Sequence, residues 1–253
     1  MQLPIGLDKS YGLPGSACRH YQCNPSMNMD WEKDIYSKGR QFNKWPYTEV
    51  VSEVKRLYPS DTLRELSIAE IGCGTGNNLL FFASEGCRVS GLDYSETALM
   101  VARDLLTKNK LEASLTVGDV TQALPWKDEC FDIMIDRGCL TQVSHQHLQS
   151  VMHEIHRVLK PGGHFFSFTL FGSNSTDLQY GVEIFPNTFS HFETGYFSKI
   201  GMTSVFDHHS IEELWTCFTI IKWNENLLTN QLNGTKLTTY SVVAEKNGQS
   251  DWQ

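Results

Sequence analysis

Apolar positions between residues 46 and 170 follow two alternating spacings, and this alternation predicts the fold class. Five short runs have the pattern of strands and cover residues 66–71, 88–92, 113–117, 131–135 and 164–170. Between them, helical spacing predicts helices over 77–84, 95–109 and the segment with an apolar stripe at Leu148, Val151, Met152, Ile155, Val158 and Leu159. Strands that alternate with helices in this way indicate an α/β domain, with a parallel sheet and helices on both faces.

The segments before the sheet have a less regular pattern. Residues 1–44 are rich in Gly, Pro, Ser, Asn and aromatic residues, with one short helix expected over about 31–37. A second helix is predicted from Pro46, because proline suits the first helical position and Val50, Val54 and Leu57 recur at helical spacing.

The pattern after the alternating segment predicts an insertion and a final pair of strands. Pro161, Gly162 and Gly163 are expected to end the last long helix, and residues 172–192 to form a long irregular insertion. Ser210 and Glu213 have the spacing of a capping box, which predicts a short helix. Residues 218–223 and 237–244 alternate like two antiparallel strands, joined by a turn over 230–234.

Length, charge and cysteines then restrict the class of protein. The chain has 253 residues, which corresponds to roughly 1.7 domains of typical size. A net charge of −8 makes nucleic acid an unexpected partner, because binding a polyphosphate needs a basic surface. Seven scattered cysteines indicate reduced thiols in a cytoplasmic protein. The start lacks a signal-peptide pattern and no apolar run is long enough to span a membrane, so we expect no membrane association.

The segment from Glu70 to Asn77, with the sequence EIGCGTGN, is the strongest candidate for a ligand site. It joins a predicted strand to a predicted helix, and its glycines allow a close approach of ligand to backbone at the helix N-terminus. A dinucleotide site would have a third glycine where Asn77 stands, and Glu70 would repel a pyrophosphate. These departures favour a ligand that presents a cation and an amino-acid group.

Four carboxylates fall at the ends of four consecutive predicted strands. They are Glu70, Asp93, Asp119 and Asp136. Asp93 follows the last glycine at close to the spacing of an acid that binds ribose hydroxyls, and Asp119 could accept a hydrogen bond from an exocyclic amine. Because ligands of open parallel sheets bind at the carboxyl ends of the strands, we expect these side chains to lie around one site.

Together these segments resemble the class I S-adenosylmethionine-dependent methyltransferases. Four signatures carry the resemblance in order, at residues 70–76 (EIGCGTG), 89–95 (VSGLDYS), 117–138 (VGDV to IDRG) and 158–163 (VLKPGG). It covers about residues 66–170 and implies a Rossmann-like, doubly wound α/β fold. The implied sheet has seven mostly parallel strands with an antiparallel final strand. Residues 45–253 would form this domain, and residues 1–44 an N-terminal extension or cap.

The resemblance also implies a cofactor, S-adenosyl-L-methionine, and residues that hold it. The backbone from Gly72 to Gly76, including Cys73 and Gly74, would hold the methionine part, with Glu70 and Asn77 beside it. Asp93 would bind the ribose hydroxyls and Tyr94 would pack by the adenine. Adenine N6 and N1 would meet the segment of Gly118, Asp119 and Val120, and the sulfonium and amino-acid end would lie near Asp136 and Arg137.

Histidines are the candidate general bases. His145 and His147 follow the fourth predicted strand near the ligand-binding edge, where an imidazole could deprotonate an acceptor. A position at the start of a solvated helix is the alternative interpretation, and both interpretations also apply to His208 and His209.

No metal site is expected. His153 and His156 lie opposite the apolar stripe and are predicted to be solvated, and their spacing differs from that of H-E-x-x-H zinc sites. Cys18, His20 and Cys23 lack a second pair of ligands.

The resemblance therefore implies a methyltransferase that acts on a small molecule, with O-methylation favoured. The stretch from Tyr36 to Val50 and the DRG turn are similar to those of methyltransferases that tailor sugars, which implies a sugar or another tailoring substrate as the acceptor. Asp136-Arg137-Gly138-Cys139 stands where an N-P-P-Y tetrapeptide would indicate methylation of a planar amino group. The alternatives are a protein side-chain methyltransferase and a catalytically silent protein that binds the cofactor. The aromatic cluster of Trp31, Tyr36, Phe42, Trp45 and Tyr47 would form a lid or anchor the extension, and both a monomer and a homodimer are compatible with it.

Overall fold

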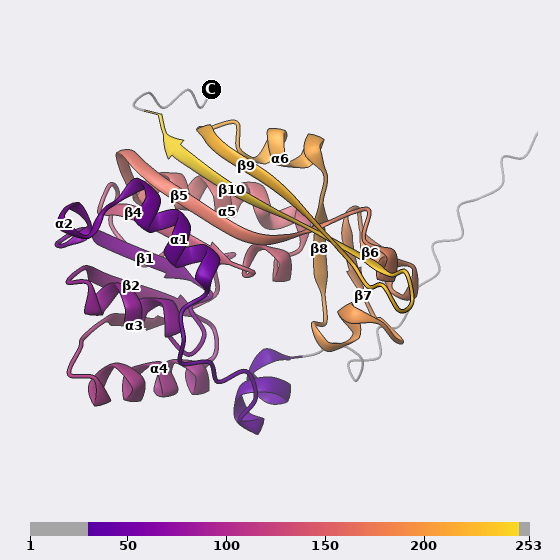
Figure 1. The fold of residues 1–253 in the computed structure, drawn as a ribbon, viewed down its shortest axis with the longest axis horizontal. Helices are drawn as coiled ribbons and strands as arrows, with labels where there is room; N and C mark the ends of the chain where they lie inside the picture. The colour runs from indigo at the N-terminus through magenta and orange to yellow at the C-terminus, as the bar shows by residue number, and fades with distance from the viewer. Residues whose placement is uncertain (1–29, 248–253) are drawn as a thin grey trace, which may run out of the picture.

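Seven strands form a continuous, twisted sheet at the centre of the structure, a computed structural model that describes residues 30–247 (Figure 1). Their spatial order is β3, β2, β1, β4, β5, β10, β9. All run parallel except β10, which is antiparallel to β5 and β9. The bounds are β1 Ser67–Ile71, β2 Arg88–Asp93, β3 Ser114–Val117, β4 Phe131–Arg137, β5 Leu159–Gly172, β9 Phe218–Thr229 and β10 Lys236–Lys246. The predicted doubly wound, mostly parallel sheet with an antiparallel final strand is confirmed.

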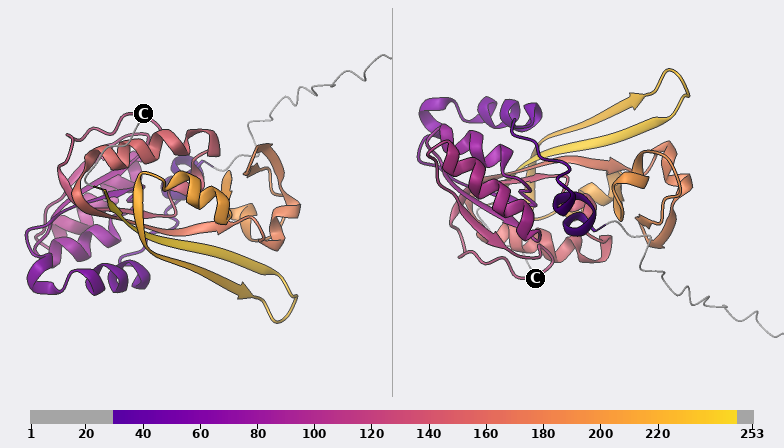
Figure 2. Two further views of the ribbon diagram at one scale, coloured as in Figure 1. Left: turned by 90° about the horizontal axis from the view of Figure 1, so that it is seen from above. Right: turned by 90° about the horizontal axis from the view of Figure 1, so that it is seen from below.

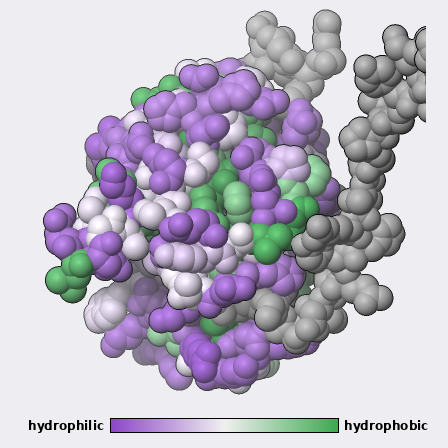
Figure 3. Space-filling model, turned by 90° about the vertical axis from the view of Figure 1, so that its right-hand side faces the viewer, coloured by the Kyte–Doolittle hydropathy of each residue, from purple (hydrophilic) through white to green (hydrophobic). Residues whose placement is uncertain are grey.

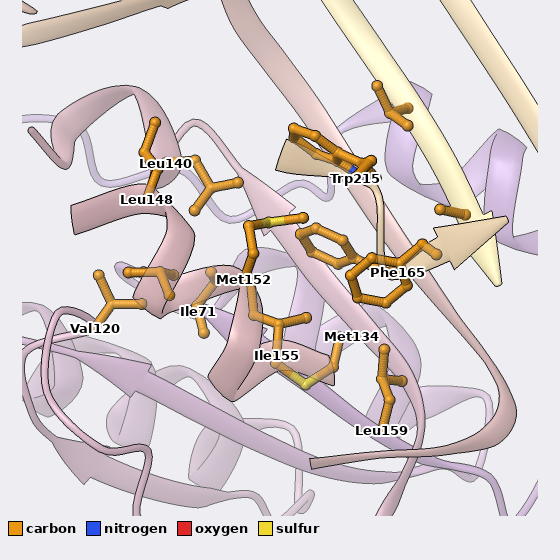
Figure 4. Close-up of a cluster of buried hydrophobic side chains, with 14 of the residues drawn as sticks. Ile71, Val120, Met134, Leu140, Leu148, Met152, Ile155, Leu159, Phe165 and Trp215 are labelled. Carbon is orange, nitrogen blue, oxygen red and sulfur yellow. The ribbon is translucent and has the colours of Figure 1, made fainter. Parts of the chain in front are cut away.

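Helices cover both faces of this sheet and bury one apolar stripe each. On one face α1 Thr48–Leu57, α3 Asn77–Ser84 and α4 Glu96–Lys108 pack against Ile68, Ile133 and Phe166 of the strands. The short helix α2 Ser60–Leu63 leads from α1 into β1. On the other face α5 His145–Val158 and α6 His208–Leu214 cover a cluster that includes Met134, Phe165 and Trp215 (Figure 4).

Strand register places the predicted ligand-binding ends at one edge of the sheet. Ile71 at the end of β1 pairs with Leu92 of β2 and with Asp136 of β4. Asp93 in turn pairs with Val117 at the end of β3. Glu70, Asp93 and Asp136, in the last residues of their strands, and Asp119, just after β3, therefore lie at one edge of the sheet, as the sequence predicts.

Residues 173–207 form a small lobe at the end of β5, so the predicted irregular insertion over 172–192 is wrong. The lobe contains η5 Thr176–Tyr180, β6 Val182–Phe185, β7 Thr188–Ser190, η6 Tyr196–Lys199 and β8 Thr203–Phe206. Strand β8 runs parallel to the last residues of β5, and β7 and β6 follow as an antiparallel pair. The hydropathy pattern did not predict its strands because polar residues occupy buried positions in them: Thr188, Ser190, Thr203 and Ser204.

The lobe and the β9–β10 hairpin project beyond the main sheet (Figure 2). Ser175 and Thr176 bond to the backbone of Thr238 and Lys236, which joins the two projections. Figure 3 shows hydrophobic side chains exposed among hydrophilic ones on one side of the molecule. Among the exposed large hydrophobic side chains of the lobe and the hairpin are Val182, Ile184, Phe185 and Leu232.

Two local helix predictions need correction. Helix α6 begins at His208, and its capping box joins Asp207 and Ser210, so Ser210 is the third helical residue and not the cap. Helix α5 passes directly into β5 at Leu159, and Pro161 to Gly163 therefore lie inside the strand, where the pairing with β4 is irregular.

His156 is buried, which contradicts its predicted solvation. Its ring lies edge-on to Phe218, with 5.4 Å between the ring centroids. The first residue of β9 therefore covers a helix face that appears polar when α5 is considered alone. His153 is exposed, as predicted.

Within residues 30–247, no helix is both long and apolar enough to cross a membrane.

Candidate functional site

The turn between β1 and α3 is formed by three glycines in left-handed backbone conformations. The φ angles of Gly72, Gly74 and Gly76 are +60°, +53° and +75°. A Cβ on Gly72 would lie 2.6 Å from Cβ of Cys139, and one on Gly74 would lie 2.9 Å from the Tyr36 hydroxyl oxygen. A side chain at either position would therefore meet both backbone strain and a collision.

Asp93, the last residue of β2, fixes this turn from the neighbouring strand. Its Oδ2 accepts a 2.8 Å hydrogen bond from the Gly74 amide, and its Oδ1 accepts one of 2.9 Å from the Ser95 amide. Burial raises the pKa of Asp93, and these two amide bonds work against that rise. The carboxylate lies beside the glycine turn as predicted, while its contact with a ribose stays a prediction.

Glu70 is a buried acid with one unused oxygen. Its Oε1 accepts a 2.7 Å hydrogen bond from Nδ2 of Asn78, whereas Oε2 has no hydrogen-bond partner within residues 30–247. Burial, with the nearby carboxylate of Asp136, raises the pKa of Glu70 to about 8, although the Asn78 bond works against the rise. An orphaned oxygen of this kind is costly unless a donor reaches it.

Asp136 is fully buried and its hydrogen bonds are with the protein itself. Oδ2 accepts a bond from Ser167, and Oδ1 accepts the amides of Cys139 and Leu140. Burial raises its pKa to about 6 against the effect of these bonds. The carboxylate therefore shapes the turn after β4, and its predicted position near a sulfonium is not tested by these contacts.

The residues predicted to surround adenine lie at the same edge of the sheet, and two of them, Tyr94 and Asp119, are more exposed to solvent than Glu70 and Asp136. Asp119 is exposed, and its Oδ1 accepts bonds from the amide and hydroxyl of Thr121. The Gly118 amide donates to the carbonyl of Asp93, and Val120 is buried. The ring of Tyr94 is half exposed, and its hydroxyl accepts the Glu32 amide.

Residues 30–47, called the strap below, run across this edge from one side to the other. The strap begins with two helical turns, η2 Trp31–Ile35 and η3 Tyr36–Lys38. The Glu32 carboxylate accepts hydrogen bonds from the Ser95 hydroxyl and from the hydroxyl and amide of Thr97, at the start of α4. Trp31 Nε1 donates a 3.0 Å bond to Gln142, in η4 Leu140–Gln142 after β4.

The second half of the strap lies over the glycine turn and the start of α3. The Thr75 hydroxyl and the Asn77 side chain donate to the backbone carbonyls of Asn43 and Trp45. The Tyr47 amide donates to Oδ1 of Asn78, the residue that also holds Glu70. The aromatic residues of the strap were predicted from the sequence as a lid or an anchor, but the roles of Glu32 and Asn78 were not. Their contacts with Ser95 and Tyr47 join positions more than thirty residues apart, and no local sequence pattern links such positions.

Arg137, the last residue of β4, is held against the end of the strap. Its guanidinium carbon lies 3.6 Å from the ring centroid of Tyr47, and its Nε bonds Glu49 at 3.3 Å. Its positive charge also lowers the pKa values of Glu70 and Asp136, against the larger effect of burial.

The two predicted base candidates have different environments. His145 is partly buried, with its ring 5.7 Å from that of Phe206 and its Nε2 without a hydrogen-bond partner in the described chain. Burial lowers the pKa of His145. His147 is exposed on the first turn of α5, next to Gln146, and His208 lies against Trp223, Tyr240 and Glu225.

Residues 30–247 contain no group of His, Cys, Asp or Glu side chains arranged to hold a metal ion. The cysteine–histidine group at Cys18, His20 and Cys23 lies outside the described residues. A surface hollow between Cys87 and Ser114 lies at the opposite edge of the sheet and shares no residue with the site.

Comparison with known families identifies the part of the chain that contains this edge. Residues 68–163 match the family model described as "Methyltransferase domain". That range contains the glycine turn, Asp93, Asp119, Asp136 and the segment after α5, so all four signatures lie inside or overlap it.

Curated relatives match the same part of the chain. A Tropheryma whipplei protein named demethylmenaquinone methyltransferase is 35% identical over 97 residues, which cover 38% of this chain and 38% of that protein. A Haemophilus influenzae protein described as uncharacterized is 31% identical over 102 residues, or 40% of this chain and 41% of its own length. The chain thus spans about two fifths of the length of these relatives.

Solved structures share the fold over a larger part of the chain. A Methanosarcina mazei protein described as a SAM-dependent methyltransferase has a TM-score of 0.63 at 21% identity, covering 81% of this chain and 100% of that chain. A Burkholderia thailandensis 1,6-didemethyltoxoflavin-N1-methyltransferase, solved with S-adenosylhomocysteine, has a TM-score of 0.55 at 18% identity and covers 77% of each chain. At these identities the similarity shows the fold.

Proposed function

Because this chain contains a class I S-adenosylmethionine-dependent methyltransferase domain, we propose that it transfers a methyl group from S-adenosylmethionine to a small-molecule acceptor. The observation that carries the proposal is the orphaned Oε2 of Glu70 beside the glycine turn. A buried carboxylate without a partner favours a ligand with a cationic donor, and the cofactor carries an ammonium group.

The other residues at this edge also fit the cofactor. The glycine turn leaves its backbone open to a ligand where side chains would collide, and Asp93 fixes that turn. Asp119 keeps its Oδ2 without a partner in the described chain, which leaves an acceptor for an exocyclic amine. The residues proposed to hold the cofactor are Glu70, Gly72, Cys73, Gly74, Gly76, Asn77, Asp93, Tyr94, Gly118, Asp119, Val120 and Asp136. The resemblance also implies a place for Arg137 near the amino-acid end of the cofactor, but its free guanidinium edge allows a different role.

The chemistry requires alignment and exclusion of water more than a dedicated nucleophile. When bound, the cofactor supplies a methyl group on a sulfonium that an acceptor displaces in line. The strap covers the glycine turn through Tyr36, Asn43 and Trp45, and we assign to it the cap role proposed for the N-terminal extension. The boundary proposed from the sequence, between residues 44 and 45, falls within the strap.

We favour an acceptor hydroxyl, as in a sugar or another tailoring substrate, with His145 as the base. Burial keeps the His145 imidazole neutral at pH 7, and its Nε2 has no partner in the described chain, which leaves a proton acceptor. His147 is exposed at the same turn. A His145→Ala variant should lower kcat and remove the pH dependence below 7, while His147→Ala should change neither.

Relatives named for quinone and sterol methylation support a small molecule as the acceptor. A protein side chain is the second candidate, supported by the exposed apolar strand β6 and by the net charge of −8, which would attract a basic partner. A catalytically silent cofactor-binding protein is the third. We propose a cytoplasmic location, which the free cysteines of the described residues favour, and a monomeric or homodimeric state.

The test measures binding and turnover separately. Isothermal titration with S-adenosylhomocysteine should give one site per chain, and incubation with S-adenosylmethionine and acceptor pools should release S-adenosylhomocysteine. Binding without product in any pool of small molecules or proteins would favour the silent protein. Absence of binding would overturn the proposed function.

A further inference from the structure

Arg137, at the end of β4 beside the proposed site, has free hydrogen-bond donors. Its Nε bonds the Glu49 carboxylate, but neither terminal nitrogen of the guanidinium has a hydrogen-bond partner within residues 30–247. The side chain is 28% exposed, so these nitrogens can be reached from solvent. A guanidinium usually uses this double-nitrogen edge to bind a carboxylate or phosphate in a bidentate manner.

The guanidinium is held in place before any ligand arrives. It stacks on the Tyr47 ring at 3.6 Å, and the Tyr47 backbone is fixed by the 2.9 Å bond from its amide to Asn78. Stacking of this kind uses the face of the guanidinium and leaves its edge available. The long bond to Glu49, at 3.3 Å with a half-exposed carboxylate, neutralises the charge only in part.

We propose that Arg137 selects an acceptor that carries an oxyanion, a carboxylate or a phosphate, and that Tyr47 holds the guanidinium in place for it. This inference rests on the proposed function and names the class of its acceptor. It assigns the free edge of Arg137 to the acceptor, whereas the resemblance to methyltransferases implies a place near the amino-acid end of the cofactor. Loss of Arg137 would weaken binding of the acceptor in the first role and binding of the cofactor in the second.

The experiment titrates matched probes into the full chain, with and without saturating S-adenosylhomocysteine. The probes are 4-hydroxybenzoate, 4-hydroxybenzamide and phenyl phosphate, and binding is followed by isothermal titration or saturation-transfer NMR. We expect the wild type to bind at least one of the two anions ten or more times more tightly than the amide. The stronger anion identifies which oxyanion the site prefers.

Variants then assign the preference to Arg137. Arg137→Gln should abolish the discrimination between anion and amide, and Arg137→Lys should retain a smaller part of it. Arg56→Gln, a control on α1 whose ion pair with Glu53 lies outside the site, should behave as the wild type. S-adenosylhomocysteine affinity should stay within twofold in all variants. If circular dichroism shows that Arg137→Gln does not fold, the reduced anion preference expected of Arg137→Lys is the test.

The proposal is overturned if the wild type does not prefer an anion, or if the preference is undiminished in Arg137→Gln and Arg137→Lys. A tenfold loss of S-adenosylhomocysteine affinity in Arg137→Gln, with no loss of anion preference, would assign the guanidinium to the cofactor instead. Failure of the wild type to bind S-adenosylhomocysteine would contradict the proposed function, while the titrations without it would still decide the role of Arg137.

Discussion

Asn78 Nδ2 donates a 2.7 Å hydrogen bond to Oε1 of Glu70, while Oδ1 of the same Asn78 accepts the backbone amide of Tyr47. One side chain at the start of α3 thus connects the buried acid at the end of β1 with the end of the strap. The other oxygen of Glu70 is buried and unpaired in the described chain. The strap and the buried carboxylate are therefore expected to respond together when a ligand fills the site.

The raised pKa of Glu70, about 8, predicts how stability without ligand depends on pH. Between pH 4.5 and 8 the unfolded chain releases this proton while the folded chain keeps it, so the unfolding free energy should fall as pH rises through that window. Glu70→Gln should remove this slope and stabilise the free protein at pH 7 by on the order of 3 kcal/mol at most.

Urea unfolding of the ligand-free protein at pH 5, 6, 7 and 8 measures this effect. Glu112→Gln, at an exposed position, is the matched control and should keep the wild-type slope. An unchanged slope in Glu70→Gln would show that Glu70 ionises normally in the folded protein.

Glu32 is expected to hold the strap closed over the cofactor. Its carboxylate binds the hydroxyls of Ser95 and Thr97 and the Thr97 amide, and these bonds, with Ser95 first, lower the pKa of Glu32. Hydrogen bonds to a charged group contribute about 1.5–3 kcal/mol, and part of that is lost when Gln replaces Glu. Glu32→Gln should therefore speed dissociation of S-adenosylhomocysteine about tenfold.

Stopped-flow fluorescence with a competing ligand gives the dissociation rate. Asp34→Asn is the control, because Asp34 lies in the same helical turn but pairs with the exposed Lys38 instead of α4. Equal rates in the wild type and both variants would mean that the strap does not limit release of the ligand.

Gly72 and Gly234 both adopt positive φ angles but differ in their surroundings. A Cβ on Gly72 would collide with Cys139, whereas a Cβ on Gly234 would have no atom within 4 Å. Gly234→Ala should cost about 1–2 kcal/mol from backbone strain. Gly72→Ala should cost about 1–3 kcal/mol more, because the collision forces a shift of the turn after β4. Chemical unfolding of the two variants measures the difference, and equal costs would contradict the close packing of Cys139 on the glycine turn.

Trp215 anchors the face of the sheet covered by α5 and α6. It is fully buried and stacks on Phe165, with 6.1 Å between the ring centroids and 13° between the planes. Trp215→Ala should destabilise the protein by about 3–5 kcal/mol. Trp215→Phe should cost clearly less, since it keeps an aromatic ring and removes an indole N–H that lacks a partner in the described chain. Equal losses of unfolding free energy in Trp215→Phe and Trp215→Ala, measured by chemical unfolding, would contradict this packing.

The sequence predicts the central fold well because its signals are local. The glycine turn, the apolar strands and the stripe on α5 each depend on residues within one element, and the structure reproduces all of them. The mostly parallel sheet with an antiparallel final strand was implied by the resemblance to methyltransferases and is confirmed. Asp93 also lies where its position at the end of β2 predicts.

The features that the sequence did not reveal depend on contacts between distant segments. The bonds from Ser95 and Thr97 to Glu32 span more than sixty residues, and His156 is buried only because Phe218 covers it. The lobe was missed because Thr188 and Ser204, polar residues, are fully buried and hydrogen-bonded to each other. Neither hydropathy nor spacing within one element contains that information.

The central claim is that the edge around Asp93 and the glycine turn binds S-adenosylmethionine. Isothermal titration of S-adenosylhomocysteine into the wild type and an Asp93→Ala variant tests it most directly. Loss of the carboxylate removes the bonds to Gly74 and Ser95 as well as the proposed ribose contact, so affinity should fall at least tenfold, with one site per chain in the wild type. No binding to the wild type, or equal affinity in a folded Asp93→Ala variant, would contradict the account.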